Sequence, residues 1–171
     1  MTAAAPLTLR TFRPADDSPF LHRWVTSRAE LIRWAGPAFR WPLDDAQVAA
    51  YAAEPGRHAW SAVADPAGDP LGHVSLLRHP DGSGARLGRV LIAPEARGRG
   101  LGEAMLRQVL DRAFGELDLP AVDLGVYTHN TAAVRLYERL GFRTEAVLAD
   151  VEEVDGEPWS ALQMRLRRPP A

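Results

Sequence analysis

Apolar residues recur every three or four positions over much of the first third of the chain, a period typical of helices that pack one face on a core. A short strand is expected first, over residues 7–12. Ser18 followed by Pro19 then supplies an N-cap and a first-turn proline. The pattern therefore predicts one helix over 18–35 and a second over 44–52.

The middle of the chain changes to the alternation expected of strands. Residues 58–64, 71–79 and 85–93 are rich in alternating apolar positions, and turn-forming residues separate them at 65–70 and 80–84. Short turns of this kind favour hairpins, so the three segments are predicted to form an antiparallel meander.

Helical and strand-like patterns then alternate to the end of the chain. A strong apolar stripe predicts a helix over 100–114, and a second helix is predicted over 133–140. Between them residues 122–126 alternate as a strand, and 162–166 alternate near the end. With no repeat and no linker, this order predicts one mixed α/β domain over residues 1–171.

Composition and charge narrow the classes of function. The chain has 171 residues, with 20 basic and 22 acidic side chains and a formal charge of -2. This balance gives no general attraction for nucleic acid or an anionic membrane, so neither is an expected partner. No apolar run approaches the roughly 20 residues of a membrane span. Residues 1–8 lack the features of a secretion signal, so we expect a cytoplasmic protein.

The absence of cysteine from the sequence removes several chemistries. It excludes disulfides, thiolate zinc sites and a mechanism through an acyl-cysteine. Nothing else in the sequence indicates a metal site. Any acyl transfer is therefore expected to be direct.

A glycine-rich turn joins the strand ending near Ala93 to the helix that begins near Gly100. It reads Arg97-Gly98-Arg99-Gly100-Leu101-Gly102. Glycines allow close approach of a phosphate, and a helix N-terminus adds positive potential, so the turn is a candidate anion site. It lacks the Gly-Lys-Ser/Thr of a P-loop and the third glycine of the dinucleotide fingerprint.

Two blocks of sequence together resemble the GNAT superfamily of acyl-CoA N-acetyltransferases. The family's phosphate-loop pattern is Arg/Gln-x-x-Gly-x-Gly/Ala after a strand, and Arg97, Gly100 and Gly102 match it. The second block follows at the family's usual interval, and its matching residues are Asn130, Ala133, Leu136, Tyr137, Leu140, Gly141 and Phe142.

The resemblance implies a fold and a ligand. The fold is a central, mostly antiparallel sheet with a V-shaped splay between two parallel strands and helices on both faces. The ligand is acetyl-CoA, used as a co-substrate without a metal. Its pantetheine arm would meet the backbone of Leu91, Ile92 and Ala93. Its pyrophosphate would be wrapped by residues 97–102, while Asn130 would face the thioester end.

The resemblance also implies the reaction, which is acetyl transfer to a primary amine of a small molecule or a peptide terminus through a ternary complex. The alternative is a non-catalytic, regulatory module that binds acyl-CoA. Many relatives dimerise, so the resemblance allows a homodimer. The sequence names neither the acceptor amine nor acyl groups other than acetyl.

The proton transfers have fewer candidates. An alkylamine of pKa about 10.4 must lose a proton before it attacks, so a base or a water relay is expected. The central strand, 84–93, carries no carboxylate. His73 and Asp123 are the candidate bases, with Glu30 and the acidic segment 150–155 as further options. By the resemblance, Tyr137 would be the general acid for the leaving thiol.

An acceptor pocket is expected from the early helices and their connection. Trp24, Arg28, Trp34 and Trp41 are its candidate residues, and they would suit an acceptor with an apolar part and an anionic group. Ordinary core packing is the alternative for the aromatic residues. The acidic stretch 150–157 either attracts a cationic amine or is a solvated loop.

Overall fold

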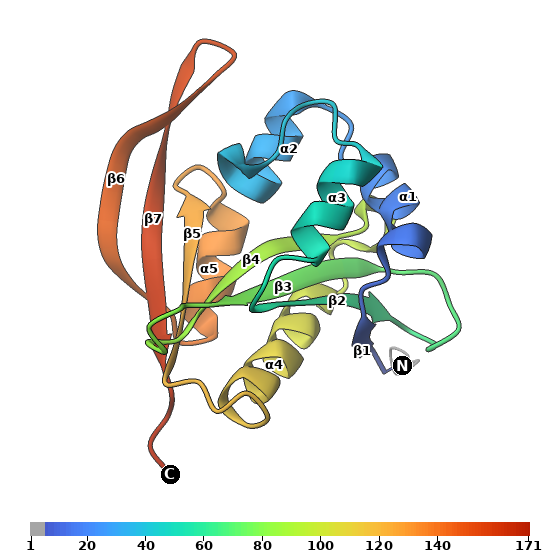
Figure 1. Ribbon diagram of the computed structural model, residues 1–171. Coiled ribbons are helices and arrows are strands. Elements are labelled where there is room, and N and C mark those ends of the chain that lie inside the picture. The colour runs from blue at the N-terminus through green and yellow to red at the C-terminus, as the bar shows by residue number, and fades with distance from the viewer. Residues whose placement is uncertain (1–5) are drawn as a thin grey trace.

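A seven-stranded sheet forms the centre of the computed structural model, which describes residues 6–171 (Figure 1). Its strand order is β1-β2-β3-β4-β5-β7-β6. In chain order the strands are β1 (Thr8–Thr11), β2 (Arg57–Val63), β3 (Gly72–Arg78), β4 (Ala85–Ile92), β5 (Ala121–Tyr127), β6 (Arg143–Val154) and β7 (Glu157–Arg167). The expected meander of β2, β3 and β4 is confirmed.

Helices cover both faces of this sheet (Figure 1). They are α1 (Pro14–Trp24), α2 (Arg28–Ala35), α3 (Asp45–Ala52), α4 (Leu101–Phe114) and α5 (Thr131–Arg139), with short 3-10 turns η1 (Gly36–Ala38) and η2 (Pro94–Ala96). One core packs α4 and α5 on the sheet, and it includes Val74, Leu76 and Met105. A second core includes Leu21, Leu31 and Val48 of α1, α2 and α3.

One strand pair is parallel, and it is only briefly paired. β4 and β5 are joined at Ala85–Val122 and Arg86–Asp123, whereas β5 and β7 are paired along the whole of β5. Beyond Arg86 the two parallel strands diverge and leave a V-shaped opening in the sheet. The predicted fold, with its mostly antiparallel sheet and its V-shaped splay, is therefore confirmed.

The prediction of one helix over 18–35 is wrong, because two helices occupy this region. The first begins at Pro14, so Pro19 lies inside it, and it ends at Val25, which has an extended backbone. Ser27 then caps α2 by accepting a hydrogen bond from the N–H of Glu30, whose carboxylate accepts from the N–H of Thr26. This reciprocal cap restarts the helix, as in a capping box.

The acidic stretch 150–157 is not a solvated loop. It belongs to the long hairpin of β6 and β7, with Glu152 opposite Trp159. Asp155 and Gly156 make its two-residue turn with φ of 51° and 81°, the conformation that favours Asp-Gly. No helix within residues 6–171 has the length and apolar character that a bilayer span requires.

Candidate acyl-CoA site

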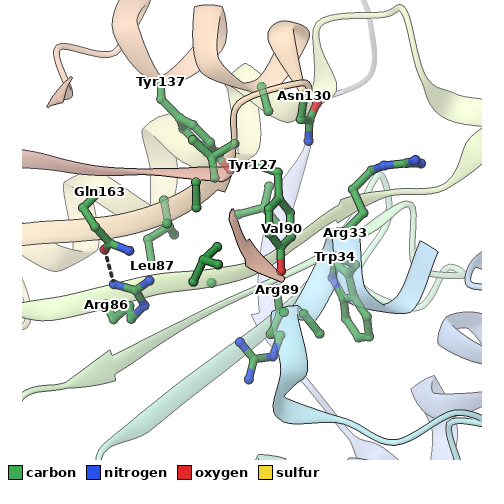
Figure 2. Close-up of a pocket in the computed structure, with 18 of the residues that line it drawn as sticks. Arg33, Trp34, Arg86, Leu87, Arg89, Val90, Tyr127, Asn130, Tyr137 and Gln163 are labelled. Carbon is green, nitrogen blue, oxygen red and sulfur yellow. Dashed lines mark hydrogen bonds between the residues drawn. The ribbon is translucent and has the colours of Figure 1, made fainter. Parts of the chain in front are cut away.

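The opening between β4 and β5 contains a cavity of about 340 Å³, here called the V cavity. Figure 2 shows its lining side chains. Residues from β4, β5, α2, η1, α5 and the β6–β7 hairpin surround it, among them Arg33, Trp34, Arg86, Leu87, Arg89, Val90, Tyr127, Asn130, Tyr137, Glu152 and Gln163. Segments that lie far apart in the sequence therefore meet at the point where the sheet splits.

An arginine closes the narrow end of the V cavity. The Arg86 guanidinium donates to Asp123 Oδ1 at 3.0 Å and to Gln163 Oε1 at 3.1 Å. Gly125 makes room for it, because a Cβ at that position would lie 2.5 Å from Arg86 Nη2. The side chains of three strands, β4, β5 and β7, thus meet across the point of divergence.

A second cavity of about 420 Å³, here called the donor channel, adjoins the V cavity. The two share Arg33, Trp34, Val90 and Asn130 as lining residues. The donor channel is also lined by Leu91, Ile92 and Arg97. It therefore extends from the split in the sheet to the glycine-rich turn.

The glycine-rich turn has the backbone that its sequence requires. Gly98 and Gly100 have φ of 76° and 74°, in the left-handed region that favours glycine. A Cβ at either position would meet nothing within 4 Å, so the space outside the turn is open. Gly100 is the N-cap of α4 and has no side chain to cap the first-turn N–H groups. These amides can therefore bind an anion.

The two arginines of the turn are anchored to the backbone. Arg97 Nε donates to the carbonyl of Ile92 at 3.1 Å, and an Arg99 Nη donates to the carbonyl of Glu95 at 3.0 Å. Both side chains remain largely exposed. Their positive charges therefore lie beside the open turn, where they add to the positive potential of the helix N-terminus.

Of the three residues expected along the pantetheine arm, Ala93 differs from the other two. It is fully buried, its N–H donates to the carbonyl of Leu71, and its carbonyl accepts from the N–H of Ala96. Leu91 and Ile92 line the donor channel. The geometry therefore favours Leu91 and Ile92 as backbone contacts over Ala93.

Tyr137 projects from α5 into the V cavity (Figure 2). Its ring packs edge-on against Phe142, with centroids 5.8 Å apart. Burial raises the pKa of Tyr137 well above the usual phenol value, so its hydroxyl stays protonated at neutral pH. It can donate a hydrogen bond within the V cavity.

His73 lies in a cluster of aromatic rings, with Phe12, Trp34 and Tyr51 around it. Its Nε2 is 2.9 Å from the Tyr51 hydroxyl. Burial, with a further contribution from the charge of Arg89, lowers the pKa of His73 to about 3. Of the described residues 6–171, those that line the V cavity do not include His73.

Asp123 makes two side-chain contacts beside the narrow end of the V cavity. It accepts from Arg86 on one oxygen and contacts His79 Nε2 with the other. Both oxygens of this carboxylate are thus occupied, and among residues 6–171 those that line the V cavity do not include Asp123. Neither His73 nor Asp123 therefore has the geometry of a base that acts directly at the cavity.

The four aromatic and arginine candidates for an acceptor pocket are divided among three cavities. Trp34 lines both the V cavity and the donor channel, while Trp24 lines the donor channel alone. Arg28 and Trp41 line a separate hollow of about 350 Å³. The structure thus places Trp34 at the centre of the site and brings Arg28 and Trp41 together outside it.

Sequence reasoning missed the cavity residues that come from the strands. Arg86, Arg89, Tyr127 and Gln163 line the V cavity, and the pattern of the sequence gives none of them a role. A pairing of β5 with β7 was needed to bring Gln163 to Gly125. The Asp-Gly turn at 155–156 was the available signal for the hairpin that carries Glu152.

Comparison with known proteins agrees with this geometry. Residues 28–142 match the model of the acetyltransferase (GNAT) family. Mycothiol acetyltransferase of Salinispora tropica is 38% identical over 143 residues, covering 80% of this chain and 44% of that protein. N-acetylaspartate synthetase of Rattus norvegicus is 32% identical over 121 residues, covering 71% of this chain and 39% of that protein.

The chain thus spans less than half the length of these curated relatives. Among solved structures, spermidine N-acetyltransferase from Vibrio cholerae in complex with CoA and spermine has a TM-score of 0.81 at 23% identity. It covers 95% of each chain, so the fold is shared over nearly all of this protein. On the family match and its own geometry, this chain belongs to the acetyltransferase (GNAT) family.

Proposed function

We propose that this protein is an N-acetyltransferase that moves an acetyl group from acetyl-CoA directly to a primary amine of a small molecule or a peptide terminus. The observation that carries the proposal is the V cavity, which adjoins a donor channel ending at an open helix N-terminus. The names of the relatives, which include mycothiol and spermidine acetyltransferases, support a small-molecule acceptor.

The donor channel has the features that an acyl-CoA needs. The free amides of residues 98–102 and the exposed charges of Arg97 and Arg99 suit a pyrophosphate. The strand backbone at Leu91 and Ile92 suits the amides of a pantetheine arm, which would lie where a neighbouring strand is missing. Asn130 lines both cavities and suits the thioester end.

In this proposal Tyr137 assists the leaving thiol. A thiol has a pKa of about 8.5, so a thiolate departs without full protonation. Because the buried phenol stays protonated, its role is to donate a hydrogen bond to the departing sulfur and stabilise the charge that develops there. The released thiolate then takes up a proton from solvent.

The ammonium of the acceptor must lose its proton before attack. Of the described residues 6–171, Glu152 is the carboxylate that lines the V cavity. It belongs to the acidic segment considered for this role, and it lies near Tyr127, whose pKa is raised first by burial and then by the charge of Glu152. We therefore assign proton acceptance, directly or through water, to Glu152 rather than to His73 or Asp123.

Release of CoA thiol tests the proposal. The protein is mixed with acetyl-CoA and a broad panel of amines, the thiol is measured, and the acetylated product is identified by mass spectrometry. Thiol release that depends on an amine is the expected result. Binding of acetyl-CoA without amine-dependent release across the panel would instead favour the non-catalytic module.

Cytoplasmic location and a homodimer stay predictions. β6 is an edge strand, and three of its apolar side chains, Val147, Leu148 and Val151, are exposed. An exposed apolar edge supports association with a second copy. Sedimentation at several protein concentrations would measure it.

A further inference from the structure

The guanidinium of Arg89 lies in a fourth cavity, here called the Arg89 pocket. This cavity of about 830 Å³ lies on the side of β4 that faces α3. The guanidinium carbon is 5.3 Å from the ring centroid of Phe39 and 5.4 Å from that of Tyr51. Two aromatic rings therefore hold the charged group in place.

Arg89 differs from the neighbouring arginines because it has no counter-ion. Arg86 is paired with Asp123, and Arg57 is paired with Glu54. Within residues 6–171 no carboxylate pairs with Arg89, and its buried Nε has no hydrogen-bond partner. Glu54 is the one carboxylate that lines the Arg89 pocket among these residues, and Arg57 already binds it.

Arg89 is half-buried and has no ion-pair partner among residues 6–171, which favours the binding of an anion. Burial, reinforced by repulsion from Arg57 and Arg86, lowers the pKa of Arg89, yet a guanidinium stays charged at any physiological pH. A buried charge without a partner is normally avoided, because desolvation is not repaid. An uncompensated guanidinium that faces a cavity is thus a binding group for an anion.

A bulge in β4 gives Arg89 its direction. Gly88 pairs with Ser75 and Leu91 pairs with His73, so Arg89 and Val90 together lie opposite Val74 alone. Arg89 has φ of 55°, which is strained for a residue with a side chain. The same residue lines the V cavity, while its guanidinium points away from that cavity (Figure 2). Arg89 therefore connects the V cavity and the Arg89 pocket.

We propose that Arg89 binds a carboxylate of the acceptor, so the acceptor is an amine that also carries a carboxylate several bonds away from the reacting nitrogen, as ω-amino acids do. This inference rests on the proposed function and specifies its substrate class. A guanidinium offers two parallel N–H donors to one carboxylate, and the rings of Phe39 and Tyr51 keep it oriented. Arg33, which also lines the V cavity, adds to the positive potential.

The balance of charge also disfavours polycationic acceptors. Three arginines line the V cavity, Arg33, Arg86 and Arg89, against the single carboxylate of Glu152 among residues 6–171. A polyamine would bring further positive charge to a site with little to neutralise it. A molecule with one amine and one carboxylate matches Glu152 and Arg89 respectively.

Matched pairs of acceptors test the inference. Each pair is an ω-amino acid and its carboxamide, for example 4-aminobutyrate, 5-aminopentanoate or 6-aminohexanoate with the carboxamide of each. The carboxamide removes a negative charge that stabilises the ammonium form, so intrinsic reactivity at pH 7 slightly favours the amides. We expect the opposite order in the protein, with kcat/KM at least about tenfold higher for the carboxylates, and Arg89→Gln should abolish that preference.

Arg13→Gln is the matched control, because Arg13 is an exposed arginine on the surface, paired with Asp16. It should keep the wild-type preference for the carboxylate over the carboxamide. Arg89→Lys, which has a single ammonium in place of two parallel N–H donors, should keep only part of that preference. A wild type that uses amides as well as carboxylates, or an Arg89→Gln variant that retains the preference, would overturn the inference.

Binding measured without turnover separates the two proposals. N-acetyl-6-aminohexanoate and its carboxamide are titrated into the protein with CoA present. Tighter binding of the carboxylate, lost in Arg89→Gln, supports the Arg89 site even if no amine is ever acetylated. Equal binding of the two compounds contradicts it even if acetylation is found. Thermal unfolding of Arg89→Gln shows whether the variant is folded.

Discussion

The donor and acceptor halves of the site are built from the chain in different ways. The proposed contacts to the acyl donor come from two short segments, 90–102 and 130–137, although Trp24, Arg33 and Trp34 of the early helices also line the donor channel. The acceptor half draws on α2, the bulge of β4 and the far hairpin. A site made of local segments depends on local backbone geometry, whereas one made of distant segments depends on strand pairing and burial.

Substitution in the glycine-rich turn should have the largest effect, and it should be confined to the donor. Gly100 has a left-handed backbone, which costs an L-residue about 1–2 kcal/mol. A valine side chain would also obstruct the amides of α4. For Gly100→Val we expect the KM for acetyl-CoA to rise by about tenfold to a hundredfold, with the KM of the acceptor unchanged in steady-state kinetics.

Gly82→Val is the matched control for strain alone. Gly82 has φ of 76° and open space around it, but it lies in the turn between β3 and β4. It should lose similar stability and keep the KM for acetyl-CoA. If both variants raise that KM alike, strain rather than the anion site explains the effect.

Acid should lower the free energy of unfolding through His73, which is buried near the proposed acceptor half of the site. His73 has a pKa of about 3 when folded, and an unfolded histidine has about 6.5. Between these values the unfolded chain binds more protons, so the contribution of His73 to stability is complete above pH 6.5 and is lost as the pH falls. From pH 7.5 to 5.0 we expect a loss of about 2 kcal/mol of unfolding free energy.

Urea denaturation at the two pH values measures this loss. His73→Phe should flatten the dependence on pH, since a ring without a titratable nitrogen replaces the imidazole among Phe12, Trp34 and Tyr51. His129→Phe, outside that cluster, should keep the wild-type dependence. A His73→Phe variant as sensitive to acid as the wild type would assign the effect to other groups.

Tyr137→Phe should act on the rate, and not on either affinity. The phenyl ring keeps its packing against Phe142, while the hydrogen bond to the departing sulfur is lost. We expect kcat to fall about tenfold, less than the hundredfold or more for a lost oxyanion donor, because a thiolate is already a good leaving group. The KM for acetyl-CoA should be unchanged. An unchanged kcat would exclude Tyr137 from the chemical step.

Glu152→Gln should give the smallest change, because water can replace a distant base. We expect kcat/KM for the acceptor to fall about threefold. Glu153→Gln is its matched control, on the same strand but outside the V cavity lining. If the two variants lower kcat/KM equally, the effect comes from the general surface charge and not from a base at Glu152.

The sequence alone predicts the donor half better than the acceptor half, for a physical reason. A glycine-rich turn before a helix needs particular residues in a fixed order, so residues 97–102 and the later block from Asn130 reveal it. The break of the early helix was missed because the apolar period continues across Ser27, whose cap competes with it. Gly88 is a weak sign of a bulge in β4, but the direction of Arg89 depends on the pairing of β4 with β3, which the sequence does not give.

The position of β6 at the edge of the sheet has a consequence for how such a protein changes over evolution. Residues 149–151 form an irregularity in its pairing with β7, and Leu148, Val151 and Glu152 there help to line the V cavity. In the described chain no strand pairs with the outer side of β6, so insertions and substitutions in it disturb little else. Acceptor preference can therefore drift through this strand while the apparatus for the acyl donor is inherited unaltered.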